Sequence, residues 1–221
     1  MTMKFFVLDR RDIGQDINGF ITEQVDNARD LISTVREWKV SRERDRHGVE
    51  CRSTEREGGK WHARISEHND IPYNTFKKYL LNDHTANESR YIKAISDFSL
   101  VEFINPQAQI YRIVYKMPLG VSNRDFTPLI LTREAKNEFF VISLAMDHPN
   151  APPDRSNKVV RGYYTSVEYV RQRELGSVEW ITATTSTASG YLPDYLTNSL
   201  LPMEIAKDVP SFIEYYKQSD F

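Results

Sequence analysis

Histidine and glutamate side chains between residues 62 and 88 are the first candidates for chemistry. His84 and Glu88 are four residues apart, so on a helix they would lie on one face, as a pair of metal ligands does. His62 and His68 lie on a different predicted element. Because only one of the pair is a histidine and the other histidines lie elsewhere, we expect solvated or hydrogen-bonded roles and no metal.

A catalytic role would require an acid or a base inside a cavity. The candidates are Tyr111, Arg112, Tyr115 and Glu179, and the sequence gives none of them a clear partner. Phosphate-binding glycine loops, nucleophile elbows and zinc-protease motifs are absent from the sequence. The single cysteine, Cys51, lies in a predicted strand and is expected to be an inert thiol.

Three charged residues in the second half of the chain are expected to be structural. Arg124 and Asp125 are adjacent at the start of a predicted strand, where they can hold the base of the preceding loop. Arg161 is expected to be an ion-pairing strand residue.

Charge and hydropathy exclude several classes of protein. The 29 basic and 31 acidic residues nearly balance, so we expect no nucleic acid and no acidic substrate as partner. No apolar run has the length of a membrane span or of a signal peptide. We therefore expect an intracellular, cytoplasmic protein that can be peripheral at membranes and that needs no cofactor.

Periodicity predicts the elements that must position these residues. Residues 1–15 are expected to form a loosely held N-terminal arm, and Asp16 to cap a helix that runs to about Glu37. Two short helices follow the third strand, the first capped by Asn74 and the second by Thr85, which forms a capping-box pattern with Glu88. We expect nine strands, at about residues 38–42, 49–54, 61–66, 100–104, 109–116, 126–133, 138–147, 158–170 and 178–186.

The C-terminal stretch is expected to organise the fold. After the last strand the chain turns at Ser189-Gly190, and Pro193 suits the first turn of a long helix. Its apolar stripe is Leu192, Tyr195, Leu196, Ser199, Leu200, Met203, Ala206, Val209 and Ile213. A sheet of many antiparallel strands must curl, so residues 16–217 are expected to form one domain whose sheet wraps this helix. Either a cavity remains between sheet and helix, or the stripe is ordinary core.

Strand alternation predicts the wall of such a cavity. One face of the strand at 109–116 carries Tyr111, Ile113 and Tyr115, and one face of the last strand carries Trp180, Thr182 and Thr184. Across the cavity we expect Tyr195, Leu196, Ser199, Leu200 and Met203 of the helix. Aromatic rings mixed with hydroxyl groups suit an amphipathic ligand, because a buried hydroxyl needs a partner. The alternative is that threonine is present only as a good strand former.

The loop after the strand at 109–116 is unusually apolar. It contains Met117, Pro118, Leu119 and Val121 around Gly120. Because loops lie at the surface, these side chains either touch a membrane while a ligand passes, or fold back onto the core.

Several short motifs resemble a known family in their order and spacing. Ser122-Asn123-Arg124-Asp125-Phe126, His148-Pro149, Val160-Arg161-Gly162 and the run from Gly190 to Leu196 resemble the START (steroidogenic acute regulatory protein-related lipid transfer) domain. Residues 61–68, His84 with Glu88, residues 164–168 and residues 180–184 resemble a fungal family of uncharacterised START-like proteins.

The resemblance implies an α+β helix-grip fold, as in START and Bet v 1-like proteins. It implies a curved nine-stranded antiparallel sheet around the last helix, a tunnel for one sterol or phospholipid, and a lid formed by residues 117–121 and the start of the helix. Some family members pair an acidic group on the fifth strand with a basic group on the sixth. Here the fifth strand offers Arg112, and the sixth has no charge before Arg133.

The first functional hypothesis is a non-enzymatic module that binds one hydrophobic ligand, such as a sterol or phospholipid, for lipid transfer or sensing. It implies transient membrane contact. The alternatives are a cyclase-like tailoring enzyme on the same fold and an interaction module without a ligand.

Overall fold

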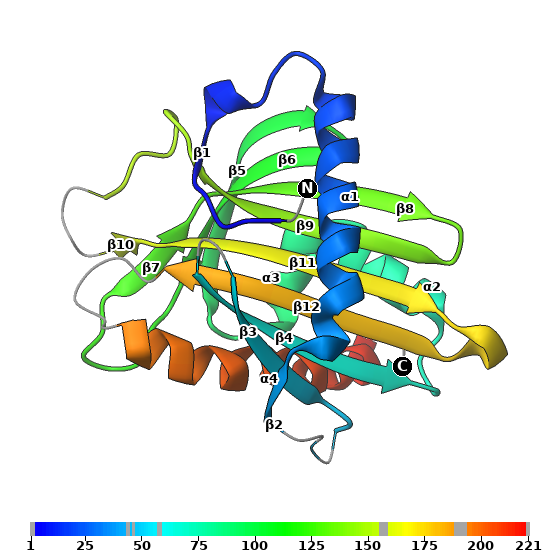
Figure 1. The fold of residues 1–221 in the computed structure, drawn as a ribbon. Helices are drawn as coiled ribbons and strands as arrows, with labels where there is room; N and C mark the ends of the chain where they lie inside the picture. The colour runs from blue at the N-terminus through cyan, green and yellow to red at the C-terminus, as the bar shows by residue number, and fades with distance from the viewer. Residues whose placement is uncertain are drawn as a thin grey trace.

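The computed structural model describes residues 3–42, 45, 47–56, 59–154, 159–187 and 194–219, with the backbone alone over 194–201. Within these residues, twelve strands form one sheet (Figure 1). The strands are β1 (Leu8–Asp9), β2 (Lys39–Arg42), β3 (Glu50–Arg56), β4 (Gly59–His68), β5 (Ile95–Asn105), β6 (Ala108–Tyr115), β7 (Asn123–Phe126), β8 (Pro128–Ala135), β9 (Glu138–Asp147), β10 (Val159–Arg161), β11 (Tyr163–Gln172) and β12 (Val178–Thr187).

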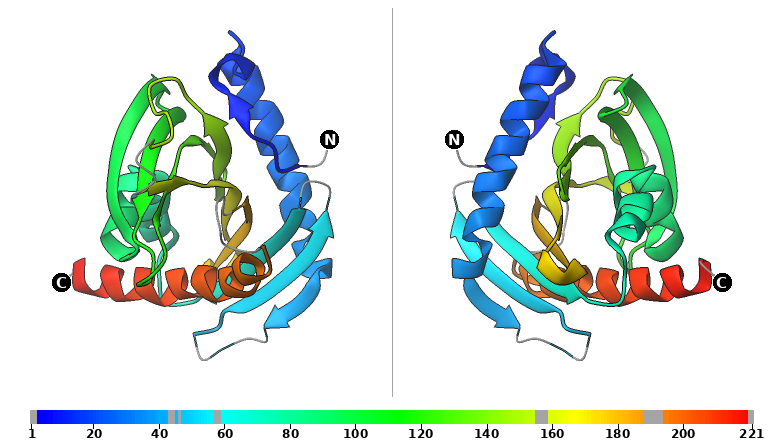
Figure 2. Two further views of the ribbon diagram at one scale, coloured as in Figure 1. Left: turned by 90° about the vertical axis from the view of Figure 1, so that its left-hand side faces the viewer. Right: turned by 90° about the vertical axis from the view of Figure 1, so that its right-hand side faces the viewer.

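The sheet is strongly curved, and its neighbours run in the order β10-β7-β6-β8-β9-β11-β12-β4-β3-β2. β5 pairs with β6, and every pairing is antiparallel except those of β1 with β9 and of β10 with β7. The C-terminal helix α4 (Asp194–Ser219) lies across the open, concave side, and the N-terminal helix α1 (Ile17–Thr34) lies outside (Figure 2). The predicted helix-grip architecture is confirmed.

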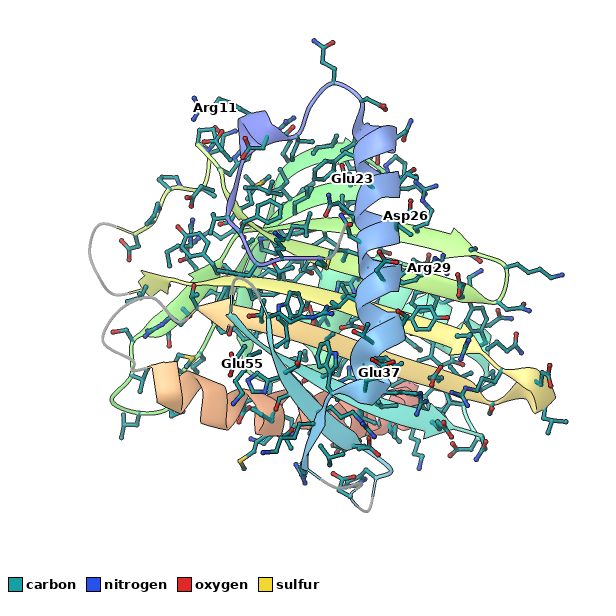
Figure 3. The ribbon with its side chains drawn as sticks, viewed as in Figure 1. Arg11, Glu23, Asp26, Arg29, Glu37 and Glu55 are labelled. Carbon is teal, nitrogen blue, oxygen red and sulfur yellow. The ribbon has the colours of Figure 1, made fainter. Side chains whose placement is uncertain are left out.

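Helix α1 forms as the sequence predicts. Its N-terminus is capped by Asp16, whose side chain accepts a hydrogen bond from the Gly19 backbone N–H at 2.9 Å, and a 3₁₀ turn at Val35–Glu37 ends it. One face of the helix is buried against the convex side of the sheet, and Glu23 and Asp26 are exposed on the other side (Figure 3). Arg29 reaches back to the sheet and pairs with Glu138 of β9 at 2.7 Å. The buried apolar residues of α1 are Ile21, Val25, Ala28, Leu31 and Ile32.

The first residues are held more firmly than a loose arm would be. β1 pairs in parallel with Met146 and Asp147 of β9, and a 3₁₀ turn at Arg10–Asp12 follows it. Met3, Leu8 and Ile13 are at most 5% exposed and join the core between α1 and the sheet. Three buried apolar contacts and a strand pairing therefore tie this segment to the domain.

Two predicted strands are each split, which raises the count above nine. The segment at 126–133 breaks at Thr127, because Pro128 has no N–H to continue the ladder. The segment at 158–170 breaks at Gly162, where β10 turns to pair with β7 while β11 pairs with β9 and β12. A Cβ atom at Gly162 would lie 2.5 Å from the Phe126 ring, so only glycine fits at this crossing.

The inserted helices begin at other residues than predicted. α2 (Tyr73–Phe76) follows Pro72 rather than an Asn74 cap, and it continues as a π-helical turn, Lys77–Leu81. α3 (His84–Tyr91) starts after Asp83, whose left-handed backbone, with φ of +45°, sets the entry of the chain. Thr85 is already inside the helix and is 1% exposed, so it is not the cap.

Helix α4 confirms the long C-terminal helix but shifts its buried stripe. Among the α4 side chains that the structure describes, the buried apolar ones are Ile205, Ala206, Val209 and Phe212. Met203 is 51% exposed and does not face the interior, so its predicted place on the cavity wall is wrong. The buried side of the helix is the one that carries Ile205, Val209 and Phe212. Tyr195, Leu196, Ser199 and Leu200 lie on α4 in the part where only the backbone is described, and Leu192 lies outside the described residues.

Candidate functional site

The concave face of the sheet carries a band of polar side chains in register. Arg64 on β4 lies opposite Thr182 on β12, and Thr182 lies opposite Glu168 on β11. One step along, His62, Thr184 and Ser166 are opposite one another on the same three strands. These side chains share a face with Trp180, which belongs to the inner apolar cluster under α4. We call these six residues the polar band.

Arg64 is the most unusual member of the polar band. It is 0% exposed, and its guanidinium carbon lies 3.8 Å from the centre of the Trp180 ring. Its Nε, Nη1 and Nη2 atoms and the Thr182 Oγ1 atom have no hydrogen-bond partner among the described residues. Leaving such donors buried without acceptors costs stability, so this face has polar groups suited to a partner outside the sheet.

Two carboxyl groups from the covering helices belong to the same region. The pKa of Glu88 on α3 is raised to about 7, mainly by burial and also by Glu168, while His84 and Arg64 act to lower it. Burial raises the pKa of Asp208 on α4 to about 8, with Arg64 opposing and Glu88 and Glu168 adding to the shift. Both side chains nevertheless retain accessible surface.

Tyrosine rings extend this region toward β6. Burial raises the pKa of Tyr115 on β6 and of Tyr164 on β11, and Glu88 raises both pKa values further. Their rings flank Phe126, with ring centres 5.4 and 5.2 Å away. Both tyrosines are only half-buried by accessible area, although protein surrounds them closely enough to shift their pKa values.

His84, Glu88 and Glu168 form a compact group. Their ligand-type nitrogen and oxygen atoms all lie within 4.8 Å of one another. His84 Nδ1 is 2.8 Å from the Leu80 carbonyl oxygen, and His84 Nε2 is 3.7 Å from Glu88 Oε2. Trp180 Nε1 donates a hydrogen bond to Glu168 Oε2 at 3.2 Å.

An aromatic cluster fills the concave face beside the polar band. Phe212 of α4 lies at its centre, with ring centres of Phe76, Trp180, Tyr91 and Tyr79 between 5.2 and 6.3 Å away. The predicted stripe of the last helix missed Phe212 and ended instead at its neighbour Ile213, which is only half-buried. This end of the concave face is therefore closed by side chains.

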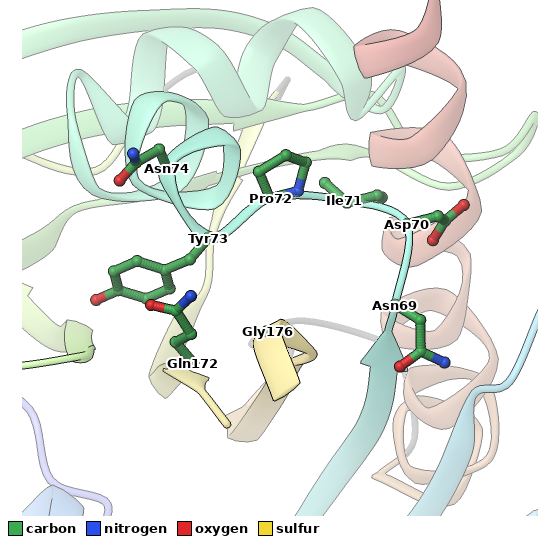
Figure 4. A pocket seen from close by; sticks show the side chains of 8 residues that line it. All are labelled: Asn69, Asp70, Ile71, Pro72, Tyr73, Asn74, Gln172 and Gly176. Atoms are coloured by element: carbon green, nitrogen blue, oxygen red, sulfur yellow. The ribbon is translucent and has the colours of Figure 1, made fainter. Parts of the chain in front are cut away.

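A pocket of about 360 Å³ lies beside the loop that follows β4 (Figure 4). Its walls are the loop after β4, the start of α2 and the β11–β12 turn. Ile71 and Tyr73 line it and also pack into the inner cluster, which separates the pocket from the polar band. The remaining lining residues are Asn69, Asp70, Pro72, Asn74, Gln172 and Gly176.

The predicted wall residues on the strands lie on the concave face. Trp180 is fully buried, and Thr182 and Thr184 are 5% and 6% exposed. Tyr111 packs against the inner cluster and donates its hydroxyl to Gln109 Oε1 at 2.8 Å. The remaining predicted wall residues of β6 are Ile113, which is fully buried, and Tyr115, described above.

The apolar loop between β6 and β7 does not fold back onto the core at its tip. Leu119 is fully exposed, and Pro118 is exposed beside it. The Val121 N–H donates to the Pro118 carbonyl at 3.0 Å, and the Met117 N–H donates to Asn123 Oδ1 at 3.1 Å. The tip therefore presents a large apolar side chain to the surroundings.

Two of the predicted catalytic candidates have structural roles. Glu179 lies on the outer side of β12 and accepts hydrogen bonds from Arg36, Arg171 and Arg173. Burial alone would raise the pKa of Glu179, but the Arg36 and Arg173 hydrogen bonds hold it below its ordinary value.

Arg112 pairs with the fully buried Asp125 at 2.8 Å, and Arg161 donates two hydrogen bonds of 3.1 Å to the same carboxylate. The predicted ion-pairing role of Arg161 and the structural role of Asp125 are confirmed. Arg124 is 4% exposed and donates to the Ser122 carbonyl at 2.6 Å, at the base of the apolar loop.

The profile of a protein family described as "Protein of unknown function (DUF3074)" matches residues 61–216. The chain belongs to this family. The matched range includes Arg64, His84, Glu88, Glu168 and Asp208.

One relative and two solved structures bear on the fold. An uncharacterized protein of Schizosaccharomyces pombe, C577.11, is 23% identical over 202 residues, which cover 88% of this chain and 84% of that protein. Human StAR-related lipid transfer protein 5 has a similar structure, with a TM-score of 0.76 and 15% identity over 92% of this chain and 99% of that chain. Human STARD10 matches with a TM-score of 0.73 and 16% identity over 88% and 82%. The fold of this DUF3074 protein is START-like.

Sequence reasoning missed Arg64, Glu168 and Asp208 as site residues. Arg64 and Glu168 lie in two of the motifs that resemble the fungal START-like family, so the convergence of those motifs was the available signal. Asp208 is beside the buried stripe of α4, and nothing in its local sequence marks it. Among the described helices, none is long and apolar enough to cross a membrane.

Proposed function

We propose that this protein binds one hydrophobic ligand with a polar end, in a hollow between the concave face of the sheet and helix α4. The supporting observation is that Glu88, Tyr115, Tyr164 and Asp208 combine raised pKa values with accessible surface. Protein surrounds each of them closely enough to raise its pKa, and yet each keeps accessible surface. Side chains that protein encloses and that still keep accessible surface are what the wall of such a hollow would present.

The two parts of the wall suit the two ends of an amphipathic molecule. Arg64 and Thr182 supply hydrogen-bond donors without partners, so the polar end would carry acceptor oxygens. Tyr111 and Tyr115 on β6, which are half-buried, supply apolar surface for the tail. Burial of the tail would contribute roughly 25 cal/mol per Å² of apolar area, before the cost of ordering the ligand.

The exposed loop tip suits transfer or sensing at a membrane. Leu119 can enter the lipid surface while the ligand enters or leaves, because it is fully exposed and packs on nothing. The similar human structures include a protein named for lipid transfer, which favours a lipid such as a sterol or phospholipid as the ligand.

Native mass spectrometry of the purified protein, followed by identification of released molecules, tests this function. We expect one bound lipid per chain. Arg64→Met should weaken its retention at least about tenfold, because a hydrogen bond to a charged group contributes about 1.5–3 kcal/mol. Arg171→Met is the matched control, since Arg171 is half-exposed on the outer side of the sheet. A protein that neither carries a lipid nor takes one up from vesicles would contradict the proposal.

A second candidate function is acid–base chemistry on the bound molecule, which Asp208 favours. A carboxylic acid with a pKa of about 8 is mostly protonated at pH 7 and can donate a proton within the hollow. Incubation with candidate lipids followed by mass analysis tests this reading. Products that form with the wild type and not with Asp208→Asn would support an enzyme. If the lipids are unchanged, binding is the only function that remains.

A further inference from the structure

We propose that His84, Glu88 and Glu168 bind one divalent transition-metal ion, such as Zn²⁺, at the edge of the polar band. The site joins two elements that are distant in the sequence. His84 and Glu88 lie one turn apart on α3, and Glu168 reaches them from β11. This inference does not rest on the lipid proposal.

The first support is the orientation of the His84 ring. A carbonyl oxygen can only accept, so the 2.8 Å contact with Leu80 places the proton on Nδ1. In the neutral ring the lone pair is therefore on Nε2, on the side of Glu88. A hydrogen bond from ligand histidine Nδ1 to a backbone carbonyl is the arrangement that orients histidine in metal sites.

The second support is that His84 Nε2 has no good hydrogen bond where it points. Its distance of 3.7 Å to Glu88 Oε2 is too long for one, and the His84 side chain is only 7% exposed. A ring nitrogen 3.7 Å from a carboxylate oxygen has the spacing at which one cation can bind both atoms.

The third support comes from the surroundings of Glu168. Trp180 Nε1 donates to Glu168 Oε2, which fixes one carboxylate oxygen and leaves the other free to coordinate. Trp180 is fully buried and held by the aromatic cluster, so this orientation is rigid. The Trp180 indole is therefore an outer hydrogen-bond donor to a ligand carboxylate, on the same face of the sheet as the polar band.

The charges of the region favour a further cation. When ionised, Glu88, Glu168 and Asp208 carry three negative charges, and Arg64 is the cation that acts on both Glu88 and Asp208. Arg64 forms no hydrogen bond with any described residue, so it does not neutralise these carboxylates by direct pairing. One divalent ion held by Glu88 and Glu168 would balance the charges of these two carboxylates when both are ionised.

The donor set defines the class of ion. One imidazole nitrogen and two carboxylate oxygens suit Zn²⁺, Mn²⁺ or Fe²⁺ better than Ca²⁺, which prefers six or more oxygens. Ligand atoms of a tetrahedral zinc site are roughly 3.4 Å apart, as bond lengths of about 2.1 Å require. Atoms already within 4.8 Å can reach that spacing by small side-chain rotations. Three protein ligands leave one position open for water or for the polar end of a ligand.

Metal titration of the full chain tests the site directly. The protein is freed of metal with a chelator, then titrated with Zn²⁺ by calorimetry and with Co²⁺ by visible absorption. We expect one ion per chain and the intense visible bands of four-coordinate Co²⁺. Glu168→Gln keeps an acceptor for Trp180 but loses the anionic ligand, so its affinity should fall more than about 100-fold, beyond the effect of an outer-shell change.

Controls separate the metal site from a folding defect and from the lipid proposal. Glu204→Gln removes an exposed carboxylate on α4 and should bind the ion as the wild type does. Circular dichroism of each variant checks the fold, and His84→Gln provides a second ligand variant. The proposal is overturned if the wild type takes up no stoichiometric ion, or if both ligand variants bind it equally well. In that case a proton shared among His84, Glu88 and Glu168 accounts for their closeness. Lipid retention is measured in the same samples, and its outcome does not depend on the metal result.

Discussion

The two faces of the sheet are made by the same strands and differ sharply in how their groups are paired. On the convex face, apolar residues of α1 and the sheet pack together, and the buried carboxylates of Glu179 and Asp125 each bind two or more arginines. On the concave face, Arg64 and the Thr182 hydroxyl have no hydrogen-bond partner among the described residues, and burial raises the carboxyl pKa values. Trp61 Nε1, in the apolar cluster of the convex face, is unpaired in the same sense, but the buried carboxylates of that face are paired. The convex face thus pairs its buried carboxylates with arginines, and the concave face leaves Arg64 without a hydrogen bond to any described residue.

The largest expected effect is on the convex face. Leu31 of α1 is 0% exposed in the apolar cluster between α1 and the convex face of the sheet, which we call the outer cluster. Leu31→Ala should lower the free energy of unfolding by about 3 kcal/mol, through lost burial and a residual cavity. Denaturant unfolding measures it, and lipid retention should stay unchanged when the variant is folded. A loss below about 1 kcal/mol would mean that the outer cluster is loosely packed.

Glu179→Gln should have the next largest effect, about 2 kcal/mol at pH 7, because it leaves three arginines without their shared carboxylate. The folded pKa of Glu179 is lowered, so its contribution is present above the unfolded pKa and is lost as the pH falls through the folded value. Unfolding curves at several pH values should show the difference from the wild type shrinking below about pH 4. A difference that is independent of pH would contradict this pairing.

Asp208→Asn should raise the free energy of unfolding at high pH, whereas Glu179→Gln lowers it. The pKa of Asp208 is raised from 3.8 to about 8, so the folded protein holds a proton that the unfolded chain releases, and stability declines as the pH rises between these values. The asparagine variant lacks this decline and should exceed the wild type by about 1–2 kcal/mol at pH 8.5, while matching it near pH 4. Thermal unfolding across this pH range measures how the two stabilities diverge. Stability curves of the two proteins that stay parallel from pH 4 to pH 8.5 would contradict the prediction.

Arg64→Met should stabilise the ligand-free protein slightly, by about 1 kcal/mol, because a buried guanidinium without hydrogen bonds is replaced by an apolar side chain of similar length. The same variant should retain lipid less well. A variant that is both less stable and equally able to hold lipid would show that Arg64 is a structural residue, like the arginines of the convex face.

Leu119→Ser should leave stability within about 0.5 kcal/mol, since Leu119 is fully exposed. It should slow lipid exchange with vesicles, because the loop tip loses the side chain that enters the lipid surface. Exchange of a fluorescent lipid between vesicles measures the rate. Phe103→Ser, at another exposed apolar residue, is the matched control and should exchange at the wild-type rate.

The sequence predicts those parts of the structure that depend on local pattern. Alternation correctly places Tyr111 and Trp180 on the concave face, and the Asp16 cap correctly starts α1. The break at Gly162 depends on the approach of the Phe126 ring, which no local pattern encodes. Tertiary packing of Phe212 likewise decided which side of α4 is buried, and it turned Met203 outward.

The candidate site was less predictable than the fold. Arg64, Glu168 and Asp208 come from β4, β11 and α4, and each looks like an ordinary strand or helix charge in its own segment. Only the curvature of the sheet and the position of α4 bring them together. Arg112 pairs with Asp125 and not with a group on the concave face. This pairing depends on β7 lying beside β6 in the sheet.

Quenching of single tryptophans by a brominated lipid tests the central contrast most directly. One variant keeps only Trp180, on the concave face, and the other keeps only Trp61, which is fully buried in the outer cluster. Bromine quenches indole fluorescence only at contact, so a lipid bound under α4 should quench Trp180 and leave Trp61 unchanged. Equal quenching of both, or quenching of neither by a lipid that binds, would contradict a ligand site on the concave face.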